Sequence, residues 1–452
     1  MGLALFATGC GGSDRGDQTQ NKVAGAGSGA NAGSGSTGDG GTNGSGATSG
    51  ATSDAGTSGS GQPSTPVGTC GNTEKAKGAE GRAQACVPTG GECSVKHGKY
   101  EPDGTPPEFE YGVLKKIGPD LGLVDSGGGA LALTLDPSNS AVIYIGFEQE
   151  NGGDGSKNGL YRSRDGGSTW KKVGTLPDDD IWDCRSTMLG WAVNVRVDPN
   201  NPDHMYVTRG VRGGVDLGFW VTWDGGESWI RAFVEDLTAM AVDPCDFCHV
   251  LLGSHTQTAV GVVESTDGGY SYVVHPPPEG FGTGGSYGIQ FLFDPRSKRG
   301  DRNTWLLHGN GMWRTANAGD SWSKVSEITG IHGFTTLYYA SNGDVYSGSY
   351  GYPARSTDNG LNWESSSNGL AMAQYYGLIG DGTNIYAMPD ALPPPSGMMF
   401  TPEGDGMNWQ PFGSSPPLDR HGMQHPAFDP NIGVVYFVNN DTVYGIKVTD
   451  GG

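Results

Sequence analysis

The fold is decided by the stretch Ser163-Arg164-Asp165-Gly166-Gly167-Ser168-Thr169-Trp170, whose pattern Ser/Thr-x-Asp-x-Gly-x-x-aromatic returns along the chain. Further copies occupy residues 222–229, 265–272, 315–322, 356–363 and 401–409, and a half copy ends the sequence at 443–452. The copy at 315–322 has Asn317 in place of Asp, and the copy at 401–409 carries one extra residue. Self-similarity at a nearly fixed spacing is the sequence signature of a repeat architecture.

Each repeat also carries strand signals before its turn. In the first repeat, the β-prone runs Ala130–Leu135 and Ala141–Ile145 are separated by Asp136-Pro137. The same Asp-Pro pair returns at residues 198, 243, 294 and 429. Three strands, the repeated turn and a final strand make a four-stranded antiparallel sheet, which is one blade of a β-propeller.

The two ends of the sequence set the number of blades. The half copy near Asp450 lacks its final strand, and residues 109–117 resemble the strand that follows the first turn. The interval from Asp165 to Asp450, divided by six, gives about 47 residues per blade. We therefore expect an all-β, seven-bladed propeller whose N-terminal strand completes the last blade and leaves no open sheet edge.

The repeated turn resembles the Asp-box (BNR) repeats of sialidase, sortilin and xyloglucanase-type propellers. Gly supplies a positive φ in this hairpin, and the Asp and Ser side chains can accept hydrogen bonds from the turn's own backbone N–H groups. The resemblance implies that the boxes lie on the rim away from the ligand-binding face. The residues at the Asp position are therefore expected to be structural: Asp165, Asp224, Asp267, Asn317, Asp358, Asp405 and Asp450.

Composition and charge exclude several classes of partner. The chain has 80 Gly among 452 residues without a period of three, which excludes collagen. Its formal net charge of −21 makes nucleic acid and anionic membrane surfaces poor partners. No run of 18 or more apolar residues is present, so the sequence predicts no membrane-spanning helix.

The N-terminus indicates export. Leu5-Phe6-Ala7-Thr8-Gly9-Cys10 resembles the lipobox of bacterial lipoproteins, in which the Cys is lipidated, although the stretch is short for a complete signal. Residues 11–67 are almost entirely small and polar and predict a disordered tether. We expect a lipoprotein signal remnant at 1–10, this tether, a short Cys-containing segment at 68–108 and a propeller at 109–452. The expected location is the cell outer membrane or cell surface, lipid-anchored, or else the secreted fraction.

Six cysteines remain once Cys10 is set aside, and an even number in an exported protein favours disulfides. Cys245-Asp246-Phe247-Cys248-His249 matches both a local disulfide and the C-x-x-C-H pattern of c-type haem attachment. Its position directly after an Asp-Pro turn favours the disulfide. The pairing of the other four cysteines stays open.

A second regularity marks the candidate binding face. Tyr287, His332, Tyr376 and His421 are each followed by Gly and each precede an innermost strand, 45, 44 and 45 residues apart. Equal spacing predicts an arc of side chains around the channel mouth, and Trp191 opens the second blade in a similar way. The arc could simply fill the bore, or it could bind a ligand through aromatic faces and titratable imidazoles. His425, four residues beyond His421, could share its strand face.

Charged candidates occupy loops expected on the same side. Glu148 and Glu150 follow the second strand of the first blade, Arg212 lies in a Gly-rich loop, and Arg420 precedes His421. Carboxylate pairs hydrolyse glycosides, whereas Tyr, His and Arg together could abstract a proton beside a uronate carboxylate. Glu148, Glu150, His332, His421 and Arg420 are therefore the candidate catalytic residues. Acidic loops can equally be solvated surface.

Comparison with the named families narrows the function. The Phe/Tyr-Arg-Ile-Pro motif of sialidases is missing, and xyloglucanase-type enzymes use two facing propellers where this sequence predicts one. We expect a binding module for an extracellular glycan or surface protein. Its candidate binding residues are Trp191, Arg212, Tyr287, His332, Tyr376, His421 and His425. One alternative is a carbohydrate-active enzyme, either a glycoside hydrolase or a polysaccharide lyase, and a further alternative is a purely structural envelope protein. The sequence predicts no cofactor and no metal site, and it favours a monomer.

Overall fold

The computed structural model describes residues 98–119, 129–148, 159–173, 192–209, 218–227, 229–233, 235–243, 245–254, 261–281, 288–292, 302–330, 337–389, 397–413, 423–439 and 442–449. These residues all belong to the larger of two units, residues 60–452. The predicted signal remnant and tether, residues 1–67, lie outside the described residues.

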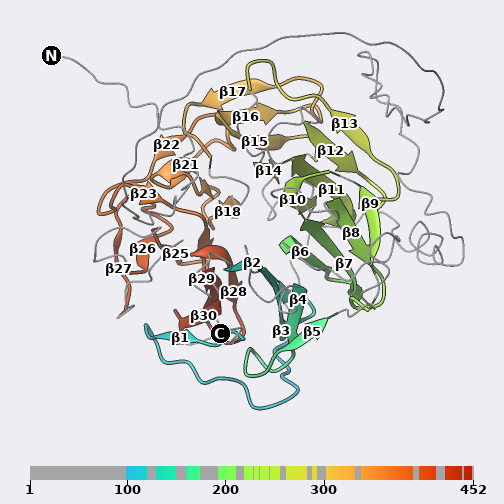
Figure 1. Cartoon of the computed structure of the whole chain (residues 1–452). Helices are drawn as coiled ribbons and strands as arrows, with labels where there is room; N and C mark the ends of the chain where they lie inside the picture. Colours follow the sequence, from blue (N-terminus) through green and yellow to red (C-terminus); the bar gives the residue numbers. More distant parts are fainter. Residues whose placement is uncertain are drawn as a thin grey trace, which may run out of the picture. The chain divides into compact units, whose positions relative to one another are not determined.

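The described residues form seven four-stranded antiparallel sheets arranged as the blades of a propeller (Figure 1). From the innermost strand outward, blades 1 to 3 are β2 (Gly129–Asp136), β3 (Asn139–Glu148), β4 (Gly159–Ser163) and β5 (Lys171–Val173); β6 (Ala192–Asp198), β7 (Asn201–Arg209), β8 (Gly218–Thr222) and β9 (Ile230–Phe233); and β10 (Leu237–Asp243), β11 (Asp246–Ser254), β12 (Val262–Ser265) and β13 (Val273–His275).

Blades 4 to 6 follow the same order along the chain. They are β14 (Gly288–Phe291), β15 (Trp305–Gly309), β16 (Gly311–Thr315) and β17 (Ser323–Ser326); β18 (Leu337–Tyr339), β19 (Val345–Ser347), β21 (Ala354–Ser356) and β22 (Glu364–Ser365); and β24 (Leu378–Gly380), β25 (Asn384–Ala387), β26 (Met399–Pro402) and β27 (Gln410–Pro411). The all-β, seven-bladed prediction is confirmed.

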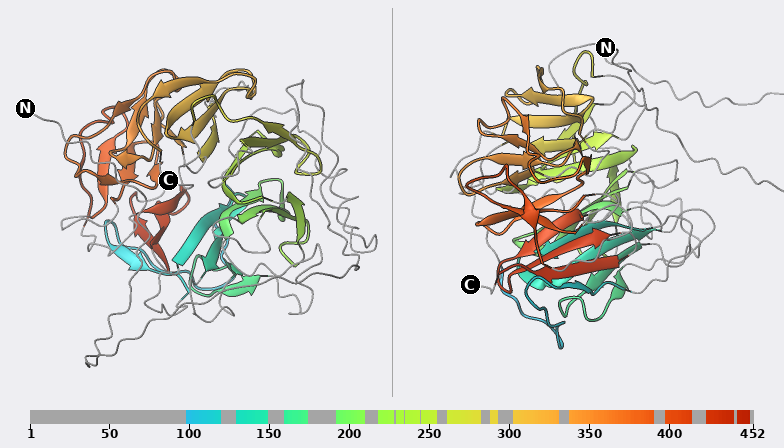
Figure 2. Two further views of the ribbon diagram at one scale, coloured as in Figure 1. Left: turned by 45° about the horizontal axis from the view of Figure 1, so that its top comes forward. Right: turned by 90° about the vertical axis from the view of Figure 1, so that its left-hand side faces the viewer.

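Blade 7 joins the two ends of the chain, as the sequence predicts. Its strands are β28 (Gln424–Asp429), β29 (Val434–Asn439), β30 (Thr442–Lys447) and, as the outermost strand, β1 (Leu114–Lys116). Figure 2 shows β1, in cyan, beside the C-terminal strands, in red. The N-terminal strand is shorter than the predicted 109–117, because Gly112 adopts a φ of 71° in a turn just before it.

Apolar side chains fill the space between neighbouring blades. Seven buried clusters occur among the described residues, one at each junction between neighbouring blades around the ring. Both faces of a blade are therefore covered, so its second strand reads as a continuous apolar run instead of an alternating one. In β3 every residue from Ala141 to Phe147 is buried. Burial on both faces makes the junctions the main source of stability.

The strand order gives the ring two functionally different ends. Turns between first and second strands and the repeated turns between third and fourth strands share one end, which we call the turn face. Loops between second and third strands, and loops leading into each innermost strand, share the other end, the channel-mouth face. Tyr376, the member of the candidate arc that the structure describes, precedes β24 and therefore belongs to the channel-mouth face.

Candidate functional site

The repeated turn is built from its own polar side chains. In blade 1 the Ser163 hydroxyl accepts a hydrogen bond from the Gly167 N–H at 2.8 Å, and Asp165 Oδ1 accepts one from the Thr169 N–H at 2.8 Å. Gly167 has a φ of 103°, a conformation that favours glycine. Trp170 donates its indole N–H to the Gly167 carbonyl at 3.0 Å and so closes the turn.

The same bonds recur in the other blades. The first hydroxyl of the turn accepts the N–H of the glycine four residues later, at 3.0, 2.7, 3.1 and 2.8 Å in the turns that contain Gly226, Gly269, Gly319 and Gly360. The Asp or Asn side chain accepts the N–H four residues later in the turns of Asp267, Asn317 and Asp358. These side chains are occupied by backbone donors within the turn.

Electrostatics agree with a structural use of these carboxylates. Burial alone would raise the pKa of Asp165, but hydrogen bonds from Thr169 and Ser163 outweigh burial and lower it. The pKa of Asp358 is lowered in the same way by Asn362 and Ser356. A carboxylate held ionised by donors of its own turn is poorly suited to act as a general acid. Asp450 lies outside the described residues.

The sixth turn departs from the pattern. Asp405 accepts hydrogen bonds from the Met407 and Asn408 N–H groups at 3.2 and 3.3 Å, while the Thr401 hydroxyl is buried without a hydrogen-bond partner. Glu403, which is 2% exposed, instead accepts the Ser341 N–H at 2.6 Å and the Tyr338 hydroxyl. Glu403 thereby ties this turn to blade 5.

Most of the predicted arc lies outside the described residues, so its geometry stays a prediction. This holds for Glu150, Trp191, Arg212, Tyr287, His332, Arg420 and His421. Glu148 is the last residue of β3, and its side chain is not described. Gly288 begins β14 and Tyr376 lies two residues before β24, so these two sequence positions do open innermost strands.

Tyr376 and Gly377 illustrate how an arc position is built. A Cβ on Gly377 would lie 2.4 Å from Pro426 Cδ, so this position requires glycine for the close approach of blades 6 and 7. The Tyr376 hydroxyl donates a hydrogen bond to Gln374 Oε1 at 2.9 Å. Tyr376 is partly exposed. It therefore connects an innermost strand with the loop that precedes it.

His425 is 4% exposed and lies at a register shift of β28 with a φ of 44°. Burial, reinforced by the charge of Arg196, lowers the pKa of His425 to about 3, so its imidazole is neutral near pH 7. Arg196 comes from the innermost strand of blade 2, and its guanidinium donates to the Val195 carbonyl at 2.8 Å. The ligand-binding role of His425 stays a prediction.

The channel-mouth face carries a short extra sheet that the sequence pattern did not indicate. β20 (Tyr350–Gly351) lies between β19 and β21, and it pairs with β23 (Ala373–Gln374) in the loop before β24. We call its side chains the β20–β23 patch: Tyr350, Tyr352, Met372, Gln374 and Tyr376. Tyr350 is 43% and Met372 69% exposed, while Tyr352, Gln374 and Tyr376 are partly exposed. Pairing of Tyr350 with Gln374 sets these two side chains beside one another.

A buried ionic network lies at the junction of blades 3 and 4. Glu264 accepts hydrogen bonds from His249 and His275, at 2.8 and 2.9 Å. His249 Nδ1 lies 3.5 Å from Asp243 Oδ2, and Arg302 Nε lies 2.9 Å from the same carboxylate oxygen as an ion pair. Sequence reasoning missed this network because its members come from different strands with no shared motif.

Two features are absent from the described residues. In that part of the chain, no helix is long and apolar enough to cross a membrane. Within the same residues, no group of three or more His, Cys, Asp or Glu side chains could hold a metal ion.

No protein-family model matches this chain, and no curated protein matches it. Among solved structures, it is similar to the GH74 xyloglucanase from Xanthomonas campestris, with 17% identity, a TM-score of 0.52, and coverage of 75% of this chain and 54% of that one. It is also similar to the extracellular domain of a hybrid two-component system from B. thetaiotaomicron, with 11% identity, a TM-score of 0.51, and coverage of 75% and 42%. This chain thus spans about half the length of those structures. At such identities the likeness shows the fold alone, a seven-bladed β-propeller.

Proposed function

We propose that this chain is an exported surface protein whose propeller binds an extracellular glycan or protein partner at its channel-mouth face. The β20–β23 patch carries the proposal. Its Tyr350 and Met372 side chains are exposed on the channel-mouth face, where Tyr376 of the predicted arc also lies. Tyrosine rings offer an apolar face and a polar edge, which suits sugar rings and protein hot spots alike.

The polar groups of the patch support recognition as well as adhesion. Gln374 is the strand partner of Tyr350, and its side-chain oxygen accepts a hydrogen bond from the Tyr376 hydroxyl. An amide beside aromatic rings can donate and accept hydrogen bonds with ligand hydroxyls. The buried Tyr375 underneath donates its hydroxyl to the Ala371 carbonyl at 2.8 Å and fixes the loop.

Retention and turnover on a panel of neutral and acidic polysaccharides test the proposal. The full chain would be compared with a Tyr350→Ala/Met372→Ala variant and with Tyr270→Ala, whose side chain is 37% exposed on the turn face. We expect retention on at least one polysaccharide or surface extract, lost in the first variant and kept in the second. Equal retention of all three proteins would contradict the proposal.

The alternative is a carbohydrate-active enzyme that uses Glu148, Glu150, His332, His421 and Arg420. The same panel separates the two functions, because only an enzyme releases products. Products that vanish in a His332→Ala/His421→Ala variant would establish the alternative and assign its catalytic residues to the arc. Retention without products would support the binding module.

We further infer that the repeated turns are Asp boxes. The support is the shared bond set, in which a Ser or Thr hydroxyl accepts the glycine N–H in five blades. Conversion of Ser356 to Ala would remove this acceptor, because the Gly360 N–H lies 2.8 Å from its hydroxyl. We expect a loss of about 1–3 kcal/mol in the free energy of unfolding.

Attachment through a lipid on Cys10 also remains a proposal, supported by the lipobox-like residues that precede it. A Cys10→Ser variant expressed in a lipoprotein-processing bacterium is expected to leave the membrane fraction and to lose labelling by a fatty acid analogue. Membrane association that is unchanged in this variant would contradict lipid anchoring.

A disulfide between Cys245 and Cys248 is proposed in preference to haem attachment. Cys245 lies within the turn in which Asp243 pairs with Asp246, and Cys248 follows three residues later in β11. His249, which would ligate a haem, is instead buried between Asp243 and Glu264. Mass spectrometry after alkylation, with and without reductant, should show two thiols appearing only on reduction.

A further inference from the structure

A charged cleft lies between blades 1 and 2 on the turn face, at the opposite end of the ring from the proposed binding surface. Its volume is about 430 Å³, within the range of small ligand sites. One wall comes from β4, β5 and the residue after β4, and carries Arg162, Arg164, Lys171 and Lys172. The other comes from β7 and the second repeated turn, and carries Asp203, Asp224 and Glu227.

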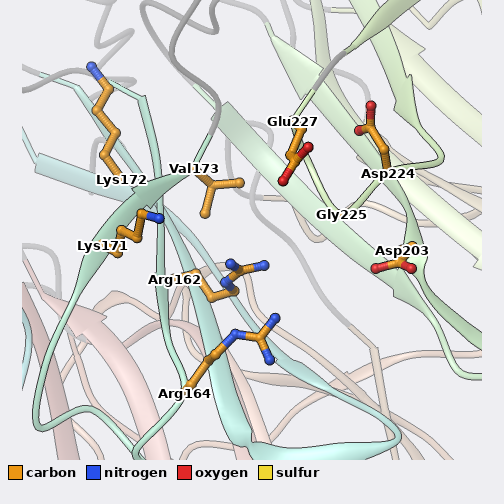
Figure 3. A pocket seen from close by; sticks show the side chains of 9 residues that line it. All are labelled: Arg162, Arg164, Lys171, Lys172, Val173, Asp203, Asp224, Gly225 and Glu227. Atoms are coloured by element: carbon orange, nitrogen blue, oxygen red, sulfur yellow. The ribbon is translucent and has the colours of Figure 1, made fainter.

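Side chains of opposite charge occupy opposite walls of the cleft. Figure 3 shows Arg162 and Arg164 extending toward the side that carries Asp203 and Glu227. Arg164 lies 4.0 Å from Asp103 of the N-terminal segment, and no ion pair of the described residues joins it to Asp203 or Glu227. A chain with a net charge of −21 concentrates four of its 28 cationic side chains here. The cleft therefore suits a ligand that carries both signs of charge.

The first repeated turn shows what such a surface can hold. Residues 99–106 run across it as an extended segment with a backbone bond from the Asp103 N–H to the Arg164 carbonyl at 2.8 Å. The Ser168 hydroxyl donates to the Thr105 carbonyl at 2.7 Å. A Cβ on Gly166 would meet the Tyr100 ring and Pro106, so the segment lies directly over the turn.

Among the residues that the structure describes, the second turn has the same geometry but no such covering segment. Gly225 has a φ of 71°, as against 68° for Gly166, and each N–H donates to a carbonyl of the neighbouring second strand, at 3.0 and 2.9 Å. A Cβ on Gly225 would meet only side-chain atoms, Asp203 Oδ1 at 3.1 Å and Arg162 Nη1 at 4.0 Å. Within the described residues, blade 2 thus presents an uncovered counterpart of the surface that residues 99–106 cover on blade 1.

We propose that this cleft binds an extended peptide segment of mixed charge from another protein. Acidic side chains of the peptide lie against Arg164 and Lys171, and its basic or N–H groups lie against Asp203 and Glu227. Complementary charges of this kind specify register and speed association more than they add affinity. The site is separate from the channel-mouth face, so the two surfaces can hold a glycan and a protein at once.

The test uses the full chain and a fluorescent peptide with the sequence of residues 99–108, Lys-Tyr-Glu-Pro-Asp-Gly-Thr-Pro-Pro-Glu, which carries both charges. Fluorescence anisotropy should show saturable binding that weakens as sodium chloride rises. Lys171→Gln and Glu227→Gln should each weaken binding by about two- to fivefold, the effect of one exposed ion pair. Lys116→Gln, an exposed cation of the outermost strand of blade 7, should leave binding unchanged.

Three results would overturn the proposal. One is no saturable binding of the peptide at millimolar concentration. Another is equal weakening by Lys171→Gln and Lys116→Gln, which would indicate general charge attraction. The third is Lys171-dependent binding of polygalacturonate without binding of the peptide, which would assign the cleft to an acidic glycan. None of these results depends on the β20–β23 patch, so the two proposals fail independently.

Discussion

Leu114 pairs with Ile446 in the outermost ladder of blade 7, so two residues 332 positions apart in the sequence close the ring. Ile117, directly after β1, reinforces this closure. Its N–H donates to the Val443 carbonyl at 2.9 Å, and its carbonyl accepts a hydrogen bond from the Trp170 indole N–H at 3.0 Å. Ile117 thus links blade 7 to the repeated turn of blade 1.

Substitution of Ile117 by Ala should therefore weaken the whole ring. The side chain is 8% exposed and belongs to the cluster between blades 7 and 1. We expect a loss of about 2–5 kcal/mol in the free energy of unfolding, measured by urea denaturation. Val113→Ala, at a site that is 39% exposed, is the control and should cost less than about 1 kcal/mol. Similar losses of unfolding free energy for the two variants would show that Ile117 does not stabilise the closure between blades 7 and 1.

Gly167 and Gly351 separate backbone strain from steric clash. Both have a positive φ, 103° and 95°. A Cβ on Gly167 would lie 2.6 Å from Ile117 Cδ1, whereas a Cβ on Gly351 meets nothing within 4 Å. Gly351→Ala should lower the melting temperature modestly, through strain of about 1–2 kcal/mol, and Gly167→Ala considerably more. An equal decrease for both variants would contradict this assignment.

The network around Glu264 should make stability depend on pH. Burial by itself would raise the pKa of Glu264, but hydrogen bonds from His249 and His275 outweigh burial and lower it to about 2. Burial would lower the pKa of His249, but hydrogen bonds to Asp243 and Glu264 outweigh burial and raise it. The carboxylate's contribution is present above its unfolded pKa of about 4.3 and is lost as pH falls toward 2. The contribution of the His249 imidazole is present below its unfolded pKa of about 6.5 and is lost as pH rises through its raised pKa in the folded protein.

Both contributions therefore operate together between about pH 4.5 and 6.5. Glu264→Gln should reduce the free energy of unfolding more at pH 5.5 than at pH 8.5. Glu279→Gln, an exposed carboxylate in the loop after the same blade, should give the same small change at both pH values. A pH-independent effect of Glu264→Gln would contradict the coupling between the carboxylate and His249.

The sixth repeated turn offers a test of two neighbouring carboxylates. Removal of Glu403 would leave the Ser341 N–H and the Tyr338 hydroxyl without their acceptor in a buried site. Glu403→Ala should therefore cost about 2–4 kcal/mol in chemical denaturation. Asp405→Ala, which affects a more exposed turn, should cost less. A larger loss of unfolding free energy in Asp405→Ala than in Glu403→Ala would show instead that Asp405 stabilises this turn more than Glu403 does.

The sixth repeated turn also shows which features could be predicted from the sequence and which could not. The Ser163–Trp170 pattern recurs along the chain at a nearly fixed spacing, so the blades, their order and the closing strand were all predictable from it. Glu403 occupies the inserted residue of a degenerate copy, and its partners Tyr338 and Ser341 are more than 60 positions away. Such contacts depend on the packing between blades, which no short motif encodes.

The candidate site divides in the same way. Equal spacing located Tyr376 at the entrance of an innermost strand, because each repeat places that position alike. The β20–β23 patch and the cleft between blades 1 and 2 were not anticipated. Both are formed by residues from different parts of the chain: Tyr350 pairs with Gln374, and Arg162 and Asp203 line opposite walls of the cleft.

The affinity of one retained oligosaccharide or partner for matched variants tests the central claim most directly. Isothermal titration calorimetry would compare the full chain with Tyr350→Ala, Tyr376→Ala and the turn-face control Tyr270→Ala. Loss of an aromatic contact should weaken binding by about tenfold or more at Tyr350 and Tyr376 and by less than about twofold at Tyr270. Unchanged affinity at Tyr350 and Tyr376, or a loss confined to Tyr270, would contradict binding at the channel-mouth face.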